Sequence, residues 1–216
     1  MFGYDVVIWD WNGTLLDDLW LALETANGML RRRGLPEMDA HRYREIFDFP
    51  VENYYRRAGF DFTVESFSVL AQEFITGFHS RIHECQLHPL VEEVVQGLHR
   101  DGVSQLVLSA SRESTLHAAV RQRGLHPYFD ALHGLHDDLA VSKAAVGLEL
   151  ISRHNLNPQR TVLIGDTVHD AEVAQKMGIP CILTASGHHS RERLETTGVP
   201  VYAGLEELRA IARERQ

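Results

Sequence analysis

The first apolar run of the chain is short and ends in polar residues. Val6 to Trp9 is long enough for one buried strand, and it is followed at once by Asp10 and then by the turn-forming pair Asn12-Gly13. In an open α/β sheet, a polar residue just beyond the carboxyl end of a buried strand lies where ligands bind. We therefore predict a strand that presents Asp10 at a functional site.

The next part of the chain has the spacing of helices. Apolar side chains recur at helical intervals over 18–33, 40–58 and 63–84. The second stretch, broken by Pro50, is typical of one or two short helices, and the third begins with Thr63, a residue type favoured at helix N-caps. No strand pattern is evident in this block. We interpret it as a helical insert between the first strand and the rest of the protein.

From residue 89 onward, helical and strand patterns alternate. Such alternation predicts an α/β fold, a doubly wound parallel sheet with helices on both faces. Crossover connections are almost always right-handed, so the ends of the strands should meet at one edge of the sheet. The expected helices cover 89–100, 112–123, 142–153, 169–176 and 205 onward, and the expected strands cover 104–109, 132–135, 161–165, 180–184 and 199–202.

Composition and charge narrow the class of protein. The chain has 216 residues, of which 44% are hydrophobic, and no apolar run approaches the roughly 18 residues of a membrane helix. We expect no secretory leader, because a strand pattern begins almost at the first residue rather than a basic-then-apolar segment. Only Cys85 and Cys181 are present, far apart and in no metal-binding spacing, so we expect two free thiols and a cytoplasmic protein.

The net charge of −9 argues against a nucleic-acid surface, which normally needs a basic face. An anionic substrate gains nothing from the long-range field of such a protein. A lysine or a metal ion must therefore hold it locally. Two carboxylates, Asp10 and Asp166, each follow a predicted buried strand, and carboxylates together with carbonyl oxygens are ligands that suit Mg²⁺.

Four motifs in the chain resemble those of the haloacid dehalogenase superfamily. Asp10-x-Asn12-x-Thr14 is similar to the first motif, and Gln105–Ser111, an apolar strand ending in hydroxyls at Ser109, to the second. Lys143, ahead of a helical pattern, is similar to the third, and Gly165-Asp166 with Asp170 to the fourth. The resemblance covers nearly the whole chain. It is greatest to the subfamily with a small helical cap that includes phosphoglycolate phosphatases.

The resemblance implies a role for each matching residue. Asp10 is expected to be the nucleophile that forms an aspartyl-phosphate, and Mg²⁺ to be bound by Asp10, Asp166 and the carbonyl of Asn12. Asp170 is expected to belong to the metal site too, where it would anchor a metal-bound water or Lys143, unless it is simply an acid that stabilises a helix N-terminus. The phosphoryl group is expected to contact Lys143, Ser109, Ala110 and Thr14.

Asn12 departs from the resembled phosphatases, most of which have an acid at this position. An amide cannot give or take a proton, so the usual acid for the leaving oxygen is missing. Three hypotheses follow. The enzyme acts on a good leaving group or takes the proton from another group such as His169; the chain is a non-phosphatase member, a dehalogenase or phosphonate hydrolase; or it is a slow or inactive phosphate-binding module.

The insert also holds candidate substrate residues. The run Tyr54-Tyr55-Arg56-Arg57 combines rings with guanidinium groups that recognise carboxylate or phosphate, although a solvated helix face is the alternative. We choose Arg56 as the candidate. Other histidines are expected in solvated loops. These are His133, clustered with His136, Asp137 and Asp138, and the pair His188 and His189.

Together these patterns predict a core over 1–16 and 83–216 and a helical cap domain over 17–82. We expect a Mg²⁺-dependent phosphohydrolase, monomeric or homodimeric, that acts on a small phosphorylated metabolite, because a closing cap excludes large substrates. We expect no nucleic-acid or membrane partner.

Overall fold

In the computed structural model, residues 3–135 and 143–214 are described, the last four of them by their backbone alone. Their centre is a six-stranded sheet in the order β5-β4-β1-β6-β7-β8, and every pair of neighbours is parallel. The expected fold class is thus confirmed. The strands are β1 (Val6–Trp9), β4 (Ser104–Arg112), β5 (Ala131–Leu135), β6 (Thr161–Gly165), β7 (Cys181–Thr184) and β8 (Val201–Tyr202).

The first strand lies in the middle of the sheet. Val6 is opposite Ser104 of β4 and Thr161 of β6, so β1 is hydrogen-bonded on both sides. Val7 and Trp9 pack into the core on one face of the sheet and Ile8 into the core on the other, and all three are fully buried. A strand buried on both faces explains why its sequence is continuously apolar rather than alternating.

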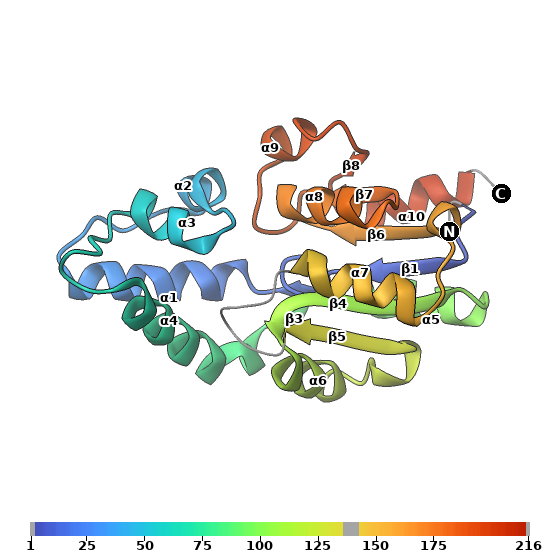
Figure 1. Ribbon diagram of the computed structural model, residues 1–216, viewed down its shortest axis with the longest axis horizontal. Coiled ribbons are helices and arrows are strands. Elements are labelled where there is room, and N and C mark those ends of the chain that lie inside the picture. The colour runs from blue at the N-terminus through green and yellow to red at the C-terminus, as the bar shows by residue number, and fades with distance from the viewer. Residues whose placement is uncertain (1–2, 136–142, 215–216) are drawn as a thin grey trace.

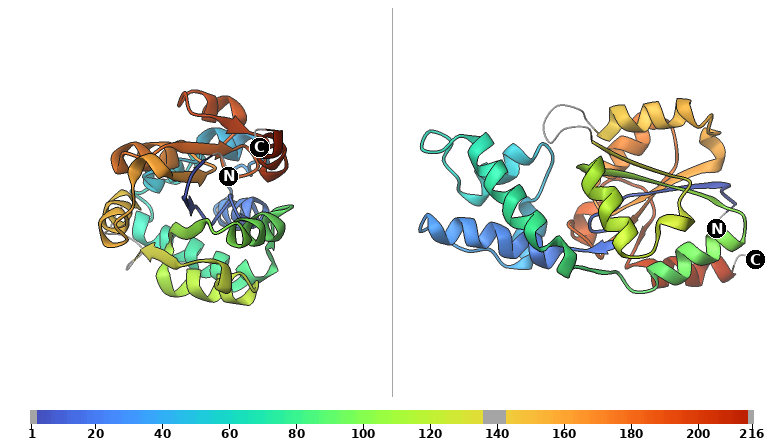
Figure 2. Two further views of the ribbon diagram at one scale, coloured as in Figure 1. Left: turned by 90° about the vertical axis from the view of Figure 1, so that its right-hand side faces the viewer. Right: turned by 90° about the horizontal axis from the view of Figure 1, so that it is seen from below.

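Helices cover both faces of the sheet, as Figure 2 shows. Apolar side chains of α5 (Val91–Arg100), α6 (Glu113–Gln122) and α10 (Leu205–Glu214) pack into the core with Trp9. Those of α7 (Lys143–Arg153), α8 (Val168–Met177) and α9 (Arg191–Glu195) pack with Ile8. The helices therefore sandwich the sheet and leave only its edges for a site.

Four helices form a lobe beyond the carboxyl ends of the strands, toward which the arrowheads of β1, β5 and β6 point (Figure 1). They are α1 (Leu19–Arg32), α2 (Ala40–Ile46), α3 (Val51–Ala58) and α4 (Phe67–Arg81). The chain enters the lobe through β2 (Leu16–Asp17) and leaves it through β3 (Gln86–Leu87), after the 3₁₀ turn Ile82–Glu84, and the two strands pair antiparallel.

Two expectations for this lobe are wrong in detail. Asp17 belongs to β2, a strand too short for its pattern to be recognised in the sequence. The third helical stretch begins at Phe67 with Ser66 at the N-cap. Thr63 instead lies in a turn, where its backbone N–H and its hydroxyl both donate to Asp61.

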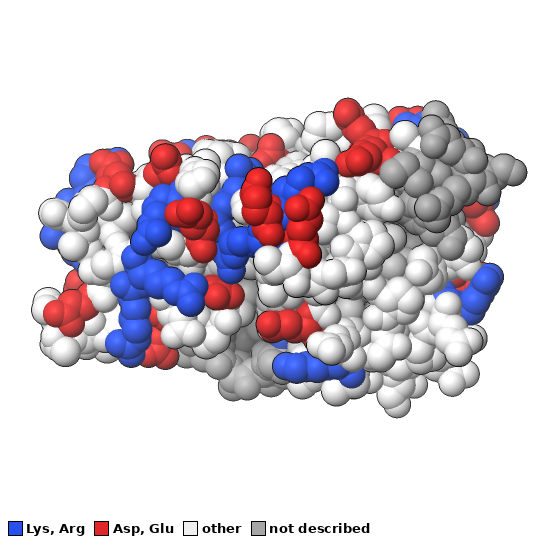
Figure 3. Space-filling model, turned by 90° about the horizontal axis from the view of Figure 1, so that it is seen from above, with Lys and Arg blue, Asp and Glu red and all other residues white. Residues whose placement is uncertain are grey.

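Arginines and acidic residues intermingle over the surface of this lobe and the neighbouring part of the sheet domain, on the face shown in Figure 3. Arginines of the lobe form ion pairs with acidic residues, for example Arg57 with Asp48 and Arg56 with Glu52. None of the helices in the described part of the chain is long and apolar enough to cross a membrane.

Candidate active site

Charged side chains meet at the edge of the sheet where β1, β4 and β6 end. Asp10 follows β1, Asp166 follows β6, and Lys143 is the first described residue of α7. Asp10 is 6% exposed, Lys143 5% and Asp166 not at all. Ser109 lies in β4, just where the register of that strand against β5 shifts between Leu108 and Arg112. The strand ends that the sequence points to are thus side by side.

Lys143 joins two of the carboxylates. Its ammonium group donates to Asp10 and, at 2.5 Å, to Asp170 in the first turn of α8. Burial opposes the charge of this lysine, but the two carboxylates more than compensate and raise its pKa. Lys143 is therefore charged and fixed in place.

Asp170 holds this arrangement together. One carboxylate oxygen accepts from Lys143, and the other accepts from the backbone N–H groups of Asp166 and Thr167 and from the Thr167 hydroxyl. The Thr167 side chain in turn accepts from the backbone N–H of Asp170, which makes a capping box. Burial opposes ionisation of Asp170, yet Lys143 lowers its pKa. Asp170 thus lies in the first turn of α8 and anchors Lys143, while its expected place in the metal site stays a prediction.

Thr14 bridges the other two carboxylates. Its hydroxyl donates to Asp166 at 2.9 Å and lies 3.4 Å from an oxygen of Asp10. The side chain is 1% exposed, and it is not among the residues that line the cavity at this site. The Thr14 hydroxyl is therefore directed at the carboxylates, and its expected contact with the phosphoryl group stays a prediction.

The donor set of this edge fits a divalent cation. Oxygens of Asp10, Asp166 and Asp170 lie within 4.8 Å of one another, and carboxylates are the ligands Mg²⁺ prefers. With all groups ionised, four buried carboxylates face two buried cations, which leaves two excess negative charges. The carboxylates are Asp10, Asp18, Asp166 and Asp170, and the cations are Lys143 and His188.

The excess negative charge affects the pKa values of the carboxylates. Burial, reinforced by the neighbouring carboxylates Asp170 and Asp166, raises the pKa of Asp10 well above its usual range despite Lys143. Burial likewise raises the pKa of Asp166 to about 6. Both oxygens of Asp170 already accept hydrogen bonds, one from Lys143 and the other from Thr167. Asp10 and Asp166 are therefore the carboxylates that would hold a metal.

Asn12 is fixed at both ends of its amide. Its Nδ2 group donates to Asp18 at 2.7 Å, and its Oδ1 atom accepts from the Ser111 hydroxyl at 2.7 Å. Asp18 also accepts from the backbone N–H of Gly13 at 2.7 Å. The amide thus ties the loop after β1 to the start of α1 and to the end of β4.

His188 was missed as a site residue. Expected in a solvated loop, it is 6% exposed, and its backbone N–H donates to Asp166 at 2.7 Å. Its ring lies between Asp18, 3.3 Å from Nε2, and the Tyr43 hydroxyl, 3.0 Å from Nδ1. Burial opposes its charge, but the carboxylates of Asp18 and Asp166 raise its pKa to about 9.

The neighbouring histidine is also buried, contrary to expectation. His189 accepts from the backbone N–H of Val168 and donates to the Phe47 carbonyl, each at 3.0 Å. Arg193 donates to the same carbonyl and to that of Arg44, and the Arg44 side chain donates to the Gly187 carbonyl. Hydrogen bonds therefore hold α9 and the loop before it against the end of α2 and the residue that follows it.

Two adjoining cavities open at this edge. One of about 70 Å³ is lined by Asp10, Lys143 and Asp170 together with the expected residues Ser109 and Ala110. A second, of about 240 Å³, lies between the sheet edge and helices α1–α4. Both are lined by the same five residues at their junction, namely Asn12, Phe47, Phe49, Ala110 and His188.

Other expected residues are placed differently. Arg56 is exposed, pairs with Glu52 and lies over the ring of Phe62, and it is not among the residues lining either cavity. The expectation that Arg56 binds substrate stays a prediction. His169 does line the smaller cavity, where it stacks on Phe49 with ring centroids 4.7 Å apart.

The His133 cluster is described only in part. The ring of His133 contacts that of His154, with 3.0 Å between their Nε2 atoms. His136, Asp137 and Asp138 lie outside the described residues. Cys85 and Cys181 are free and buried, as expected.

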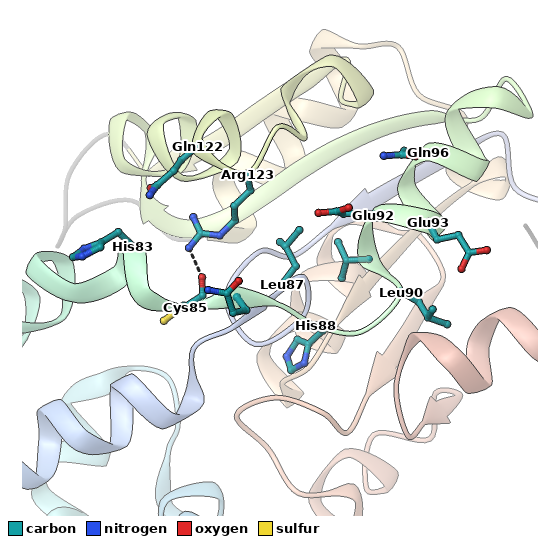
Figure 4. A pocket seen from close by; sticks show the side chains of 12 residues that line it. His83, Cys85, Leu87, His88, Leu90, Glu92, Glu93, Gln96, Gln122 and Arg123 are labelled. Carbon is teal, nitrogen blue, oxygen red and sulfur yellow. Dashed lines mark hydrogen bonds between the residues drawn. The ribbon is translucent and has the colours of Figure 1, made fainter.

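A larger depression of about 720 Å³ lies away from this chemistry, beside the segment that returns from α4 to the sheet (Figure 4). Arg123, at the end of α6, borders it and donates to the carbonyls of Ile82 and Cys85. The lining also includes Glu92 and Glu93 but none of the clustered carboxylates. Arg123 therefore has a structural role, holding the returning segment against the sheet domain.

Comparisons with known proteins agree with this geometry. The chain is 23% identical over 188 residues to the phosphoglycolate phosphatase of Synechococcus elongatus, which covers 87% of each chain. It is 28% identical over 201 residues to that of Caulobacter vibrioides, which covers 89% of this chain and 83% of the relative. A solved haloacid dehalogenase-like hydrolase from Streptococcus pneumoniae superposes with a TM-score of 0.83 at 21% identity, over 98% of this chain and 99% of that one.

The model of the haloacid dehalogenase-like hydrolase family matches residues 7–184, well over half of the chain. The protein therefore belongs to this family, and the resemblance found in its motifs is confirmed.

Proposed function

We propose that this haloacid dehalogenase-like hydrolase is a Mg²⁺-dependent phosphatase that acts on a small phosphorylated metabolite through an aspartyl-phosphate on Asp10. One observation carries the proposal: Asp10 is buried at the end of β1, is held by Lys143, and borders a small cavity that Ser109 and Lys143 also line. The similarity to two phosphoglycolate phosphatases supports a phosphoric ester as substrate.

The reaction divides into two displacements at phosphorus. In the first, a carboxylate oxygen of Asp10 attacks phosphorus, the bond from phosphorus to the leaving oxygen breaks, and that oxygen takes up a proton. In the second, water attacks the phosphorus of the acyl phosphate, which releases inorganic phosphate and restores Asp10. Lys143 keeps Asp10 oriented and offers positive charge to the phosphoryl oxygens throughout.

Mg²⁺ would be held by Asp10, Asp166 and the backbone carbonyl of Asn12, and it supplies positive charge against the phosphoryl oxygens. We propose that Asp170 positions Lys143 rather than binding the metal, because its two oxygens already accept hydrogen bonds from Lys143 and Thr167. Helices α1–α4, between residues 17 and 82, would act as the cap that closes over the substrate.

The leaving oxygen has no evident proton donor among the described residues of this site. The amide of Asn12 has no proton to transfer, and both of its ends are engaged by Asp18 and Ser111. General acid assistance is typically worth about 10² to 10⁴ in rate. The protein should therefore favour substrates whose leaving group departs without an acid, such as acyl phosphates.

Hydrolysis of acetyl phosphate tests this proposal, because its leaving group is an acetate that needs no proton. We expect turnover that requires Mg²⁺ and that falls by at least about 10⁴-fold in Asp10→Asn, as for other nucleophile replacements. Retention of turnover in that variant would assign the nucleophile elsewhere.

Metal binding is tested separately. Asp166→Ala should lose Mg²⁺ binding measured by calorimetry while the far-ultraviolet circular dichroism stays native. Undiminished Mg²⁺ affinity would refute the site. Release of chloride from a 2-haloacid without added metal, together with no phosphatase activity, would instead identify a dehalogenase.

A second candidate function is a phosphate-binding module with negligible turnover. The observation that favours it is the Asn12 amide, which is built into the structure by two short hydrogen bonds as a fixed part of the loop. Mg²⁺-dependent phosphate binding without acetyl phosphate turnover would support this candidate over the enzyme.

A further inference from the structure

The larger of the two cavities at the site has a wall of unusual composition. Thirteen of its lining residues come from the helical lobe beyond Asp18, and eight of these are aromatic. Rings from three different helices and from the loop after α2 therefore line one cavity. The aromatic residues are Tyr43, Phe47, Phe49, Tyr54, Tyr55, Phe67, Phe74 and Phe78.

Some of these rings contact one another edge to face, while the pairs Tyr43–Phe47 and Phe74–Phe78 stack nearly parallel. Tyr54 lies 5.4 Å from Phe47 and 5.6 Å from Tyr55, centroid to centroid, both at steep angles. The Tyr54 hydroxyl is buried, with no hydrogen-bond partner among the described residues. A polar atom of a bound molecule can satisfy such a group.

Charge is confined to the opposite side of the cavity. Of the described residues that line it, none contributed by the lobe is Lys or Arg, and His79 is the only titratable nitrogen from there. Asp18 and His188 line the side of the cavity opposite the rings, and they pair with each other. Arg112, an exposed residue at the end of β4, is the remaining cation in the lining. A carboxylate placed against the lobe would thus lose its water without gaining a cation.

The size of the cavity limits its occupant. Its volume of about 240 Å³ exceeds the roughly 150 Å³ in which an apolar protein cavity holds benzene. One substituted ring therefore fits. The cavity meets the phosphate side at Asn12 and Ala110, so a group seated among the rings can be joined to a phosphoryl group at Asp10.

Building on the proposed phosphatase function, we propose that the substrate is a phosphate ester whose leaving group carries a single apolar or aromatic ring. The ring occupies the cavity beneath α2, α3 and α4, and the phosphoryl group lies at Asp10 and Lys143. A short carboxylate such as that of phosphoglycolate is therefore not the preferred substrate, which distinguishes this chain from what the names of its relatives suggest.

Three alkyl phosphates test the proposal because they differ in the group that would enter the cavity. Benzyl phosphate brings a ring, ethyl phosphate a methyl group and 2-phosphoglycolate a carboxylate. Their dissociation constants are measured by calorimetry with Mg²⁺ on Asp10→Asn, which cannot transfer the phosphoryl group. A hydrophobic pocket discriminates about 10- to 200-fold for a single methylene, so benzyl phosphate should bind at least about 10-fold more tightly than the other two.

A cavity-filling variant localises the effect. Ala71 of α4 lines the cavity and is 7% exposed. Ala71→Leu, in the same Asp10→Asn background, should weaken benzyl phosphate about 10-fold or more relative to ethyl phosphate. Val69→Leu on the same helix is the matched control, because Val69 is 54% exposed and does not line the cavity. In the Val69→Leu variant, the ratio of the affinities for benzyl phosphate and ethyl phosphate should equal that of Asp10→Asn alone.

Enlarging the wall gives a second variant should Ala71→Leu not fold. Phe74→Leu opens space at the same face of α4 and should also reduce the preference for benzyl phosphate. Tightest binding of 2-phosphoglycolate, lost in Arg112→Gln, would overturn the proposal in favour of a carboxylate substrate. Equal affinities for all three esters would overturn it as well.

The proposed function fails by a different result. It fails when wild-type protein does not hydrolyse acetyl phosphate with Mg²⁺, whatever the ester affinities are. The ring preference fails when acetyl phosphate is hydrolysed and benzyl phosphate still binds no better than ethyl phosphate.

Discussion

The floor and the roof of the site are built from opposite kinds of side chain. In the floor, at the sheet edge, Lys143 bridges Asp10 and Asp170, and Thr14 bridges Asp10 and Asp166. The roof, formed by the helical lobe, holds the eight aromatic rings. Each charge of the floor depends on a particular partner, whereas every ring of the roof except Phe74 contacts at least two other rings.

This difference predicts how each region responds to change. Removal of one partner of a buried ion pair leaves an uncompensated charge, which costs more than the pair contributes. When one ring contact in the roof is lost, the neighbouring rings keep their other contacts, so the energetic cost is smaller. The floor should therefore respond with large effects on stability and rate, and the roof with smaller effects on binding.

Lys143 gives the sharpest contrast. Lys143→Met should destabilise the metal-free protein by about 3–5 kcal/mol, because Asp10 and Asp170 lose their buried cation. Urea denaturation followed by circular dichroism measures this change. Lys176→Met on the exposed side of α8 is the control and should stay within about 0.5 kcal/mol of the wild type. A Lys143 variant as stable as the control would remove the basis for treating the floor as one coupled unit.

The floor could be predicted from sequence and the roof could not. Asp10, Ser109 and Asp166 each lie at the end of an apolar run, and parallel topology brings such ends to one edge. Lys143 and Asp170 were found only through the motif resemblance. The burial of His188 depends on Tyr43, which is distant in the chain and covers it from α2. A Gly-His-His run by itself is typical of a loop.

The roof escaped prediction for a related reason. Aromatic residues at helical spacing, such as Phe67, Phe74 and Phe78, have the pattern of any helix that packs on a core. Whether they close a core or line a cavity depends on how the helices meet, which the spacing does not encode. Arg56 drew attention because it carries chemistry, yet its side chain is exposed. Residue type alone therefore does not show which side chains of the lobe line the cavity.

The pH dependence of stability tests the excess negative charge of the floor. In the metal-free protein the pKa of Asp166 is about 6, above the ordinary aspartate value, so the folded state binds more protons than the unfolded state between pH 4 and about 6. Stability should therefore fall as pH rises through that window, by about 3 kcal/mol from this carboxyl. Saturating Mg²⁺ should reduce the fall.

Asp166→Asn, which removes the titrating group, is the control in the same urea titrations. The difference in unfolding free energy between wild type and this variant should change by that amount between pH 4 and 7. A constant difference across the range would show that the carboxyl carries no excess charge.

Asn12 lies where floor and roof meet, and Asn12→Asp tests what its amide does. The introduced carboxyl would lie about 2.7 Å from Asp18, where the amide now donates. Two carboxylates so close cannot both ionise easily, so one pKa rises and a proton is retained. That proton can protonate a leaving oxygen.

We therefore expect Asn12→Asp to accelerate benzyl phosphate hydrolysis by at least about 10², the lower end of general acid assistance. An aryl phosphate with an acidic phenol needs less help and should gain little. Steady-state rates on the two esters measure the contrast, with Asn12→Ala as the control for loss of the amide. Equal gains on both esters would mean that Asn12 orients the substrate.

The smallest effect is expected where the roof is fastened to the floor. Arg193 of α9 donates to the carbonyls of Arg44 and Phe47, and so connects the sheet domain to the segment that carries two rings of the cavity wall. Arg193→Met should raise the KM for benzyl phosphate about 3- to 10-fold, since hydrogen bonds from a charged group are lost but water can replace them when the lobe moves away. The kcat should change less, because the carboxylates and Lys143 are untouched. Arg191→Met on the same helix, whose side chain pairs with Glu195 and Glu207 at the surface, is the control and should leave KM unchanged. If Arg193→Met instead lowers kcat and KM together, closing of the roof limits turnover. The position of the roof then determines the rate at the floor as well as the binding of substrate.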